Sequence, residues 1–150
     1  MGREIEHKHL VANDGWRADV TRSTHIRQGY LSVHPDRTVR VRITDEEAFI
    51  TIKGRTHGAA RDEFEYPIPR PDAEQIYARL CERRLEKRRH YIPVGEQTWE
   101  VDEFITPHAG LVLAEIELER EDEPYQRPPW LGDDVTADPR YTNSALAASS

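Results

Sequence analysis

Charged residues of one sign recur at every second position in several segments of this chain. The segment REIEHKHLV, residues 3–11, is the first of them, with an isoleucine and two histidines at the intervening positions. Successive side chains of a β-strand point to opposite faces, so a period of two places each charged row on one face. The rows that share this spacing are Glu4/Glu6, Arg40/Arg42, Glu63/Glu65, Lys87/Arg89 and Glu115/Glu117. The pattern predicts strands, with one face of the sheet lined by charge.

Apolar alternation and turn residues predict a mostly β protein of the α+β class. The expected strands cover residues 3–11, 24–33, 37–44, 47–53, 60–69, 85–93, 97–105 and 110–119. A helix is expected from Pro71 to about residue 83, because proline is favoured in a first helical turn. Its core-facing residues would be Ile76, Leu80 and Cys81, and a short second helix is expected near residues 143–147. Seven or eight antiparallel strands favour a barrel or a sandwich with helices packed outside.

Length and composition exclude several classes of protein. The 150 residues predict a single domain, residues 1–150. The net charge of −7 argues against generic nucleic-acid binding, and no apolar run approaches the ~20 residues of a membrane span. Cys81 is the single cysteine and so forms no disulfide within the chain, which fits a reducing cytoplasm. We therefore expect a cytoplasmic protein without nucleic-acid or membrane partners.

An ordinary solvated sheet face is the simplest interpretation of any one charged strand. Such a face mixes polar residues and pairs opposite charges across strands, whereas here whole rows carry one sign. Like charges two positions apart on a strand lie about 6.5–7 Å from each other and repel. Acidic and basic rows that face one another across an enclosed space would bind a ligand carrying both charges. A polyphosphate with its divalent metal is such a ligand, because carboxylates bind the metal while Arg and Lys bind phosphate oxygens.

Several segments resemble, in order along the chain, the segments of one protein superfamily. Glu4, Glu6 and Lys8 match the ExExK signature of the CYTH domain, or triphosphate tunnel metalloenzyme, superfamily. The other similar segments are RQGYL (27–31), VRVR (39–42), TIK (51–53), EFEY (63–66), EKRR (86–89), WEVDEF (99–104), LAEIE (113–117) and RYTNSALA (140–147). The resemblance implies a closed eight-stranded antiparallel β-barrel, a tunnel with a charged lumen. It also implies hydrolysis or cyclisation of triphosphate compounds with Mg²⁺ or Mn²⁺.

The resemblance also implies roles for the charged rows. The phosphate-binding bases would be Lys8, Arg40, Arg42, Lys53, Lys87 and Arg89. The metal-binding positions would be Glu4, Glu6, Glu115 and Glu117, and the further acidic lumen positions Glu63, Glu65 and Asp102. Tyr30 and Lys87 are the candidate catalytic residues, since Tyr30 matches a tyrosine proposed as a proton acceptor in some relatives. The alternative role for Tyr30 is a hydrogen bond to a lumen carboxylate.

Three functions stay open at this point. The leading one is metal-dependent hydrolysis of inorganic triphosphate to diphosphate and phosphate. An enzyme for thiamine triphosphate or ATP, including an adenylyl cyclase of the same fold, would need a ring pocket, and no aromatic cluster accompanies the lumen rows. A non-catalytic polyphosphate-binding module would need bases but no metal ligands.

Thr142 and Ser144 stand where many relatives carry lysines, a departure that bears on closure of the tunnel entrance. An apolar outer face would permit a homodimer.

Overall fold

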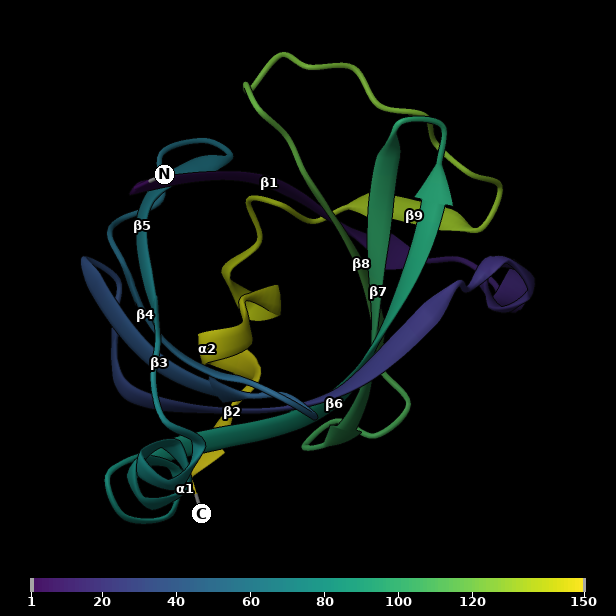
Figure 1. Ribbon diagram of the computed structural model, residues 1–150. Helices are drawn as coiled ribbons and strands as arrows, with labels where there is room; N and C mark the ends of the chain where they lie inside the picture. Colours follow the sequence, from purple (N-terminus) through teal and green to yellow (C-terminus); the bar gives the residue numbers. More distant parts are fainter. Residues whose placement is uncertain (1, 150) are drawn as a thin grey trace.

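Eight antiparallel strands close into a barrel (Figure 1). The computed structural model describes residues 2–149. The barrel strands are β1 (Gly2–Val11), β2 (Arg22–His34), β3 (Arg37–Ile43), β4 (Ala48–Lys53), β5 (Ala60–Pro67), β6 (Arg83–Val94), β7 (Gln97–Thr106) and β8 (Val112–Glu117). Neighbours follow the order β6-β2-β3-β4-β5-β1-β8-β7, and the pairing of β6 with β7 closes the ring. The predicted mostly β class and closed barrel are confirmed.

The strand register brings the charged rows of different strands onto one inner surface. Arg40 lies opposite Thr51, which lies opposite Glu65, and Lys8 lies opposite Glu115 across β1 and β8. The buried charged residues of this surface are Glu4, Lys8, Arg40, Lys87, Arg89, Asp102 and Glu115. Buried charge requires a partner of opposite sign or a ligand. The charged face is therefore the lumen of the barrel and not a solvated surface.

The helix α1 (Arg70–Arg79) packs on the outside of β3 and β4 (Figure 1). Pro71 stands in its first turn, as predicted. The helix ends earlier than expected, and Leu80 is 60% exposed, so the prediction of Leu80 as a core residue was wrong. The chain turns there toward β6, and Cys81 enters the core under α1. Gly29 makes room for it, because a Cβ at Gly29 would lie 2.5 Å from Cys81 Sγ.

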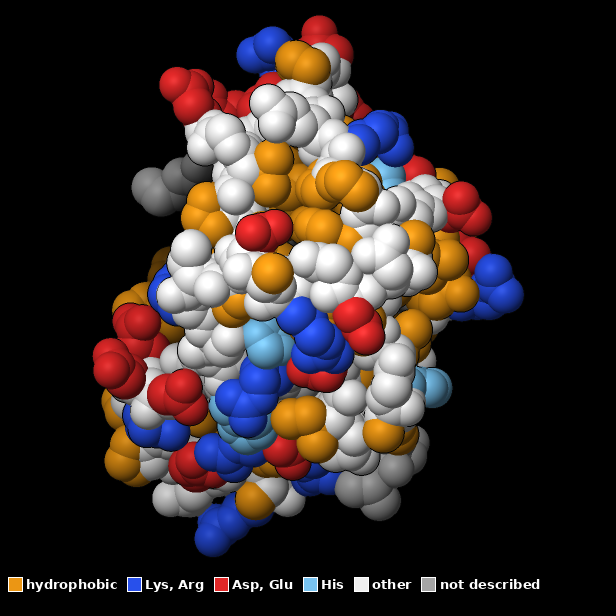
Figure 2. All heavy atoms as spheres, turned by 90° about the vertical axis from the view of Figure 1, so that its right-hand side faces the viewer, with side chains coloured by type: hydrophobic (Ala, Val, Ile, Leu, Met, Phe, Trp, Pro, Cys, Tyr) orange, Lys and Arg blue, Asp and Glu red, His pale blue; other side chains and the backbone are white. Residues whose placement is uncertain are grey.

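A second outer core contains three buried tryptophans. Trp16 lies in the short helix η1 (Asp14–Asp19), Trp99 in β7, and Trp130 just before β9 (Leu131–Asp134). β9 adds to β1 beyond the eight-stranded ring, and neither η1 nor β9 was predicted. Trp99 packs away from the lumen, in accordance with its position out of phase with the acidic residues of β7. Figure 2 shows this side of the molecule, where acidic and basic side chains are intermixed over the surface.

The C-terminal segment closes one end of the lumen. It contains η2 (Pro139–Tyr141), α2 (Asn143–Leu146) and β10 (Ala148–Ser149), and α2 lies within the outline of the barrel in Figure 1. Leu146 packs with Tyr30, Leu85, Phe104 and Leu113. Leu85 and Phe104 continue the inward-facing rows of β6 and β7, so the lumen is apolar at this end and charged beyond it. No helix within residues 2–149 has the length and apolar character needed to cross a membrane.

Candidate active site in the barrel lumen

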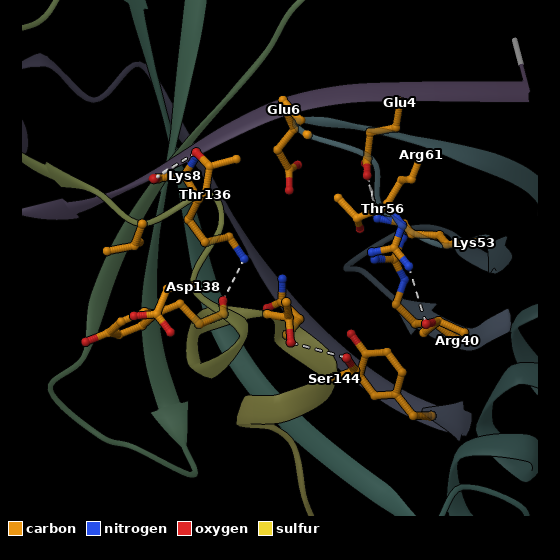
Figure 3. Close-up of a pocket in the computed structure, with 18 residues that line it drawn as sticks. Glu4, Glu6, Lys8, Arg40, Lys53, Thr56, Arg61, Thr136, Asp138 and Ser144 are labelled. Atoms are coloured by element: carbon orange, nitrogen blue, oxygen red, sulfur yellow. Dashed lines mark hydrogen bonds and ion pairs between the residues drawn. The ribbon is translucent and has the colours of Figure 1, made fainter. Parts of the chain in front are cut away.

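A cavity opens into the charged part of the lumen (Figure 3). Strand β1 contributes Glu4, Glu6 and Lys8 to the lining, and Arg40 of β3 and Lys53 of β4 lie on the side of the cavity next to Glu4, across from Lys8. The loop between β4 and β5 and the segment 135–144 supply the remaining walls. On each of these strands, alternate residues face inward, so inward-facing side chains from separate strands meet around one cavity.

Lys87, Arg89, Asp102 and Glu115 form a buried ion-pair cluster in the lumen. Lys87 Nζ donates to Asp102 Oδ2 at 2.7 Å, and Arg89 Nε donates to Asp102 Oδ1 at 2.8 Å. Arg89 Nη2 also donates to Glu115 Oε1 at 3.1 Å. Burial lowers the pKa of Lys87 to about 7 although Asp102 opposes it, whereas the pKa of Asp102 is lowered because Arg89 and Lys87 outweigh the effect of burial. The ion pairs thus stabilise the charge of Asp102, whereas burial costs the Lys87 ammonium more than Asp102 restores.

The two other lumen lysines are also held by carboxylates. Lys8 Nζ lies 3.2 Å from Glu115 Oε2 and donates to the carbonyl oxygen of Tyr141 at 2.8 Å. Lys53 Nζ donates to the two carboxylate oxygens of Glu4 at 3.0 and 3.1 Å. These ammonium groups are therefore fixed in position, with acceptors that phosphate oxygens can replace.

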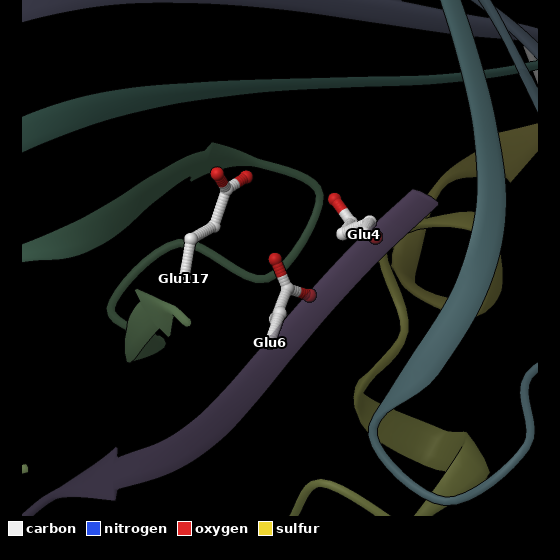
Figure 4. Close-up of side chains that lie close together, drawn as sticks. All are labelled: Glu4, Glu6 and Glu117. Carbon is white, nitrogen blue, oxygen red and sulfur yellow. The ribbon is translucent and has the colours of Figure 1, made fainter. Parts of the chain in front are cut away.

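Glu4, Glu6 and Glu117 form an acidic trio on β1 and β8 (Figure 4). Each contributes a carboxylate oxygen, and these atoms lie within 4.8 Å of one another. Burial, together with Glu115 and Glu4, raises the pKa of Glu6 to about 8. Glu117 is exposed at the rim of the trio, and partial desolvation, together with Glu100 and Glu4, raises its pKa to about 7. Lys53 neutralises part of the charge of Glu4, but the trio as a whole has more negative charge than its surroundings balance.

The two lumen-facing arginines of β3 have unused hydrogen-bonding capacity. Arg40 Nη2 donates to Thr51 Oγ1 at 3.1 Å and lies 3.4 Å from Glu65 Oε2, yet the buried Arg40 Nε has no partner within residues 2–149. Arg42 Nε donates to Gln28 Oε1 at 2.8 Å, and no carboxylate of the described chain pairs with Arg42. Burial, with Arg40 and Arg89 nearby, lowers the pKa of Arg42 to about 10. An anionic ligand would satisfy both guanidinium groups.

The family model described as the CYTH domain matches residues 2–145. The chain belongs to the CYTH domain family. It is 43% identical over 147 residues to an inorganic triphosphatase of Acetivibrio thermocellus, across 97% of this chain and 94% of the relative. It is 38% identical over 153 residues to an inorganic triphosphatase of Nitrosomonas europaea, across 97% of each. A crystal structure of an inorganic triphosphatase has a TM-score of 0.68 at 35% identity, across 98% of this chain and 95% of that one.

Membership of the CYTH family, a family of triphosphate tunnel metalloenzymes, implies a divalent metal ion. The acidic trio fits such an ion on two independent grounds. Its donors are carboxylate oxygens, the ligands that hard divalent cations prefer, and they are close enough to share one ion. The raised pKa values of Glu6 and Glu117 indicate that added positive charge at this point would be stabilising.

The CYTH barrel turns the other predicted residues inward as well. Glu63 Oε2 lies 3.6 Å from Lys53 Nζ, and Glu65 contacts Arg40. Glu115, which the resemblance placed among the metal ligands, pairs here with Lys8 and Arg89 and lies outside the trio. Tyr30 lines the cavity, and its hydroxyl accepts a hydrogen bond from Gln28 Nε2 at 3.1 Å. No hydrogen bond joins Tyr30 to a carboxylate within residues 2–149. The roles of these residues stay predictions.

Three residues of the site were absent from the sequence analysis. Arg61 lines the cavity and shares its phase with Glu63 and Glu65, so the period of two on β5 was a signal for it. Glu100 shares its phase with Asp102 and lies 3.3 Å from Arg89 Nη1. Asn143 accepts a hydrogen bond from Lys87 Nζ at 3.0 Å, and no local pattern marks it because this contact depends on how the C-terminal segment packs.

Proposed function

We propose that this CYTH protein hydrolyses inorganic triphosphate to diphosphate and phosphate, with Mg²⁺ or Mn²⁺ as cofactor. One observation carries the proposal: lumen bases line the same cavity as Glu4 and Glu6, two members of the uncompensated acidic trio. A metal-bound triphosphate has the opposite distribution of charge. The two relatives at 43% and 38% identity, both inorganic triphosphatases, support the same reaction.

The lumen bases are suited to bind a linear triphosphate. Such a molecule carries about four or five negative charges near neutral pH. The bases that would bind it are Lys8, Arg40, Arg42, Lys53, Lys87 and Arg89. Arg42 and the Nε of Arg40 gain acceptors that they lack in the ligand-free protein. The lysines exchange carboxylate contacts for phosphate contacts, so they add less to affinity than Arg42 does.

Glu4, Glu6 and Glu117 would hold the divalent ion. When bound, Mg²⁺ or Mn²⁺ withdraws electron density from phosphate oxygens and lowers the pKa of a coordinated water. Ligation requires ionised carboxylates, so Glu6 and Glu117 give up the protons that their raised pKa values favour in the metal-free protein. The trio therefore also neutralises part of the charge of the incoming ion.

Lys87 and Tyr30 are the groups that we assign to proton handling. Lys87 has a pKa lowered to about 7 by burial, so its Nζ can hold or release a proton near neutral pH. This suits it to protonate, or to stabilise, the phosphate oxygen on which charge develops as the phosphoanhydride bond breaks. Tyrosine is a poor base at neutral pH, since its ordinary pKa is near 10. The Tyr30 hydroxyl is better suited to orient water or phosphate by donating a hydrogen bond.

Organic triphosphates fit the cavity less well. A nucleobase or a thiamine ring needs an apolar or aromatic pocket beside the phosphate site. The exposed part of the lining consists of small residues, such as Thr56 and Gly58, and the aromatic lining residues are two tyrosines, Tyr30 and Tyr141. A non-catalytic binding module is disfavoured by the acidic trio, because a protein that only binds anions gains nothing from carboxylates that repel them.

Phosphate release tests the proposal directly. The purified protein is assayed with tripolyphosphate, ATP and thiamine triphosphate in parallel, each with Mg²⁺, with Mn²⁺ and with EDTA. We expect EDTA to abolish hydrolysis, either metal to restore it, and kcat/KM for tripolyphosphate to be about 100-fold or more above that of the other two. Full turnover in metal-free buffer, or faster cleavage of ATP or thiamine triphosphate, would contradict the proposal.

A further inference from the structure

Arg61 is a lumen arginine that forms no ion pair with a carboxylate of residues 2–149. It lies directly opposite Glu4 across β1 and β5, yet the Glu4 carboxylate is bound by Lys53 at 3.0 and 3.1 Å. Arg61 Nε donates to the carbonyl oxygen of Gly54 at 3.1 Å, and its Nη2 contacts Thr38 Oγ1 at 3.4 Å. These contacts fix the guanidinium group. Within residues 2–149, its Nη1 has no hydrogen-bond partner.

Arg61 lies on the solvent-exposed side of the lumen bases Lys53 and Arg40. Its contact Thr38 is directly opposite Lys53 and precedes Arg40 in the same phase of β3. Figure 3 shows Arg61, Lys53 and Arg40 on one side of the cavity, across from Glu6 and Lys8. The most exposed lining residues, Thr56 and Gly58, lie in the adjoining loop before β5. Arg61 therefore continues the row of bases toward solvent.

The exposed part of the cavity lining determines how a triphosphate can lie in the site. Leu146 packs with Leu85, Phe104 and Leu113 beside the cavity, at the barrel end where the loop before β5 also lies. The chain of phosphates therefore follows the charged rows, with its outermost group at the rim formed by Thr56 and Gly58. A nucleoside attached to it has to project outward past Thr56 and Gly58. The phosphate nearest the rim is then a terminal group in inorganic triphosphate but the esterified α-phosphate in a nucleoside triphosphate.

We propose that Arg61 binds this outermost phosphate and makes the site prefer inorganic triphosphate to nucleoside triphosphates. A guanidinium binds two oxygens side by side, and a terminal phosphate offers more charge and one more unesterified oxygen than an α-phosphate does. The unused Nη1 donors therefore contribute more to the binding of inorganic triphosphate than to the binding of a nucleoside triphosphate. The inference rests on the proposed function, because it assigns a specificity residue to the same site.

The decisive variant is Arg61→Gln, which removes the charge but keeps a side-chain amide able to bind Gly54 or Thr38. We expect kcat/KM for tripolyphosphate to fall at least tenfold, mainly through KM, and kcat/KM for ATP to fall less than threefold. Arg61→Lys should lie between the wild type and Arg61→Gln. Arg3→Gln is the matched control, because Arg3 is exposed on the outer face opposite Asp62, and it should leave both values unchanged.

Binding gives a second readout that is independent of turnover. The rise in melting temperature produced by tripolyphosphate and by ATP is measured for the same variants. Arg61→Gln should reduce the rise with tripolyphosphate more than the rise with ATP. Equal losses for both ligands in both assays, or no loss, would overturn the Arg61 assignment while leaving triphosphate hydrolysis intact. A wild type that hydrolyses no triphosphate, but binds tripolyphosphate through Arg61, would refute the proposed function alone.

Discussion

The buried ion-pair cluster and the acidic trio lie on the same inner wall, but only the cluster is balanced by its own charges. In the cluster, Asp102 accepts hydrogen bonds from Lys87 and Arg89 at 2.7 to 3.0 Å. In the trio, the carboxylates of Glu6 and Glu117 face one another across β1 and β8. The pKa of Asp102 is lowered, whereas burial and acidic neighbours raise the pKa of Glu6 to about 8.

The charges of the ion-pair cluster are balanced by other protein groups, whereas the charges of the acidic trio would be balanced by a bound ligand. The cluster is assembled when the barrel closes, and removal of one member leaves the others buried without a partner. The trio is assembled at the same time but remains repulsive until a cation binds. Sites of this second kind lower the stability of the free protein in exchange for function. Mutations in the two regions should therefore move stability in opposite directions.

The largest expected effect on stability is the loss of Asp102. Asp102→Ala would leave Lys87 and Arg89 buried with too little negative charge, so we expect the free energy of unfolding to fall by about 3–5 kcal/mol. Denaturant unfolding at neutral pH measures it. Asp133→Ala, which removes an exposed carboxylate, is the control and should change stability by less than about 0.5 kcal/mol. A cost for Asp102→Ala no larger than that of the control would mean that the cluster does not stabilise the fold.

An intermediate effect is expected at Arg42, which lies in the lumen but has no carboxylate partner in the described chain. Arg42→Ala should lower kcat/KM for tripolyphosphate by about 100-fold, equivalent to about 2.7 kcal/mol. Stability should change little, because a buried cation without an anion is itself costly. Arg79→Ala, at the exposed end of α1, should leave activity unchanged. Equal losses of activity in the two variants would show that strand phase does not distinguish lumen from surface.

The sequence predicted the strands and the inner rows because both follow from a local period of two. Arg40, Lys87 and Glu115 could be placed on one surface before any contact was known, since alternation fixes the face. Arg61 and Glu100 carry the same signal, and the period of two on their strands was sufficient to find them. The prediction of a longer α1 failed at Leu80, because a helical pattern does not reveal where tertiary packing turns the chain.

Contacts between distant segments could not be predicted in this way. Asn143 bonds Lys87, and the carbonyl oxygen of Tyr141 accepts from Lys8, only because the C-terminal segment enters the barrel. The division of the acids into Glu115, paired with bases, and the unbalanced trio likewise depends on distances across strands. Sequence spacing assigns a side chain to a face, but its partner on that face depends on register and barrel closure.

The smallest expected effect concerns the stability of the metal-free protein, and it tests the trio itself. The pKa of Glu6 is raised above that of an unfolded glutamate, so the folded state binds more protons between the two values. Its contribution to stability is full below about pH 4.5 and is lost as pH rises through about 8. Lys87 titrates in part of this range with the opposite sign, so the difference between wild type and Glu6→Gln isolates Glu6.

Glu6→Gln should therefore stabilise the metal-free protein by about 1–2 kcal/mol at pH 8.5 and by less at pH 6, because the wild-type carboxyl regains its proton there. Thermal and denaturant unfolding in EDTA at the two pH values provide the measurement. Hydrolysis by the same variant should fall sharply and require more Mg²⁺, so the stability of the metal-free protein rises while its activity falls. His7→Gln, on the other face of β1, should leave the Mg²⁺ requirement unchanged, and Glu46→Gln, in an exposed turn, should leave the pH dependence unchanged. A Glu6→Gln protein that is less stable than wild type at pH 8.5 would mean that the trio is balanced without a metal, like the ion-pair cluster.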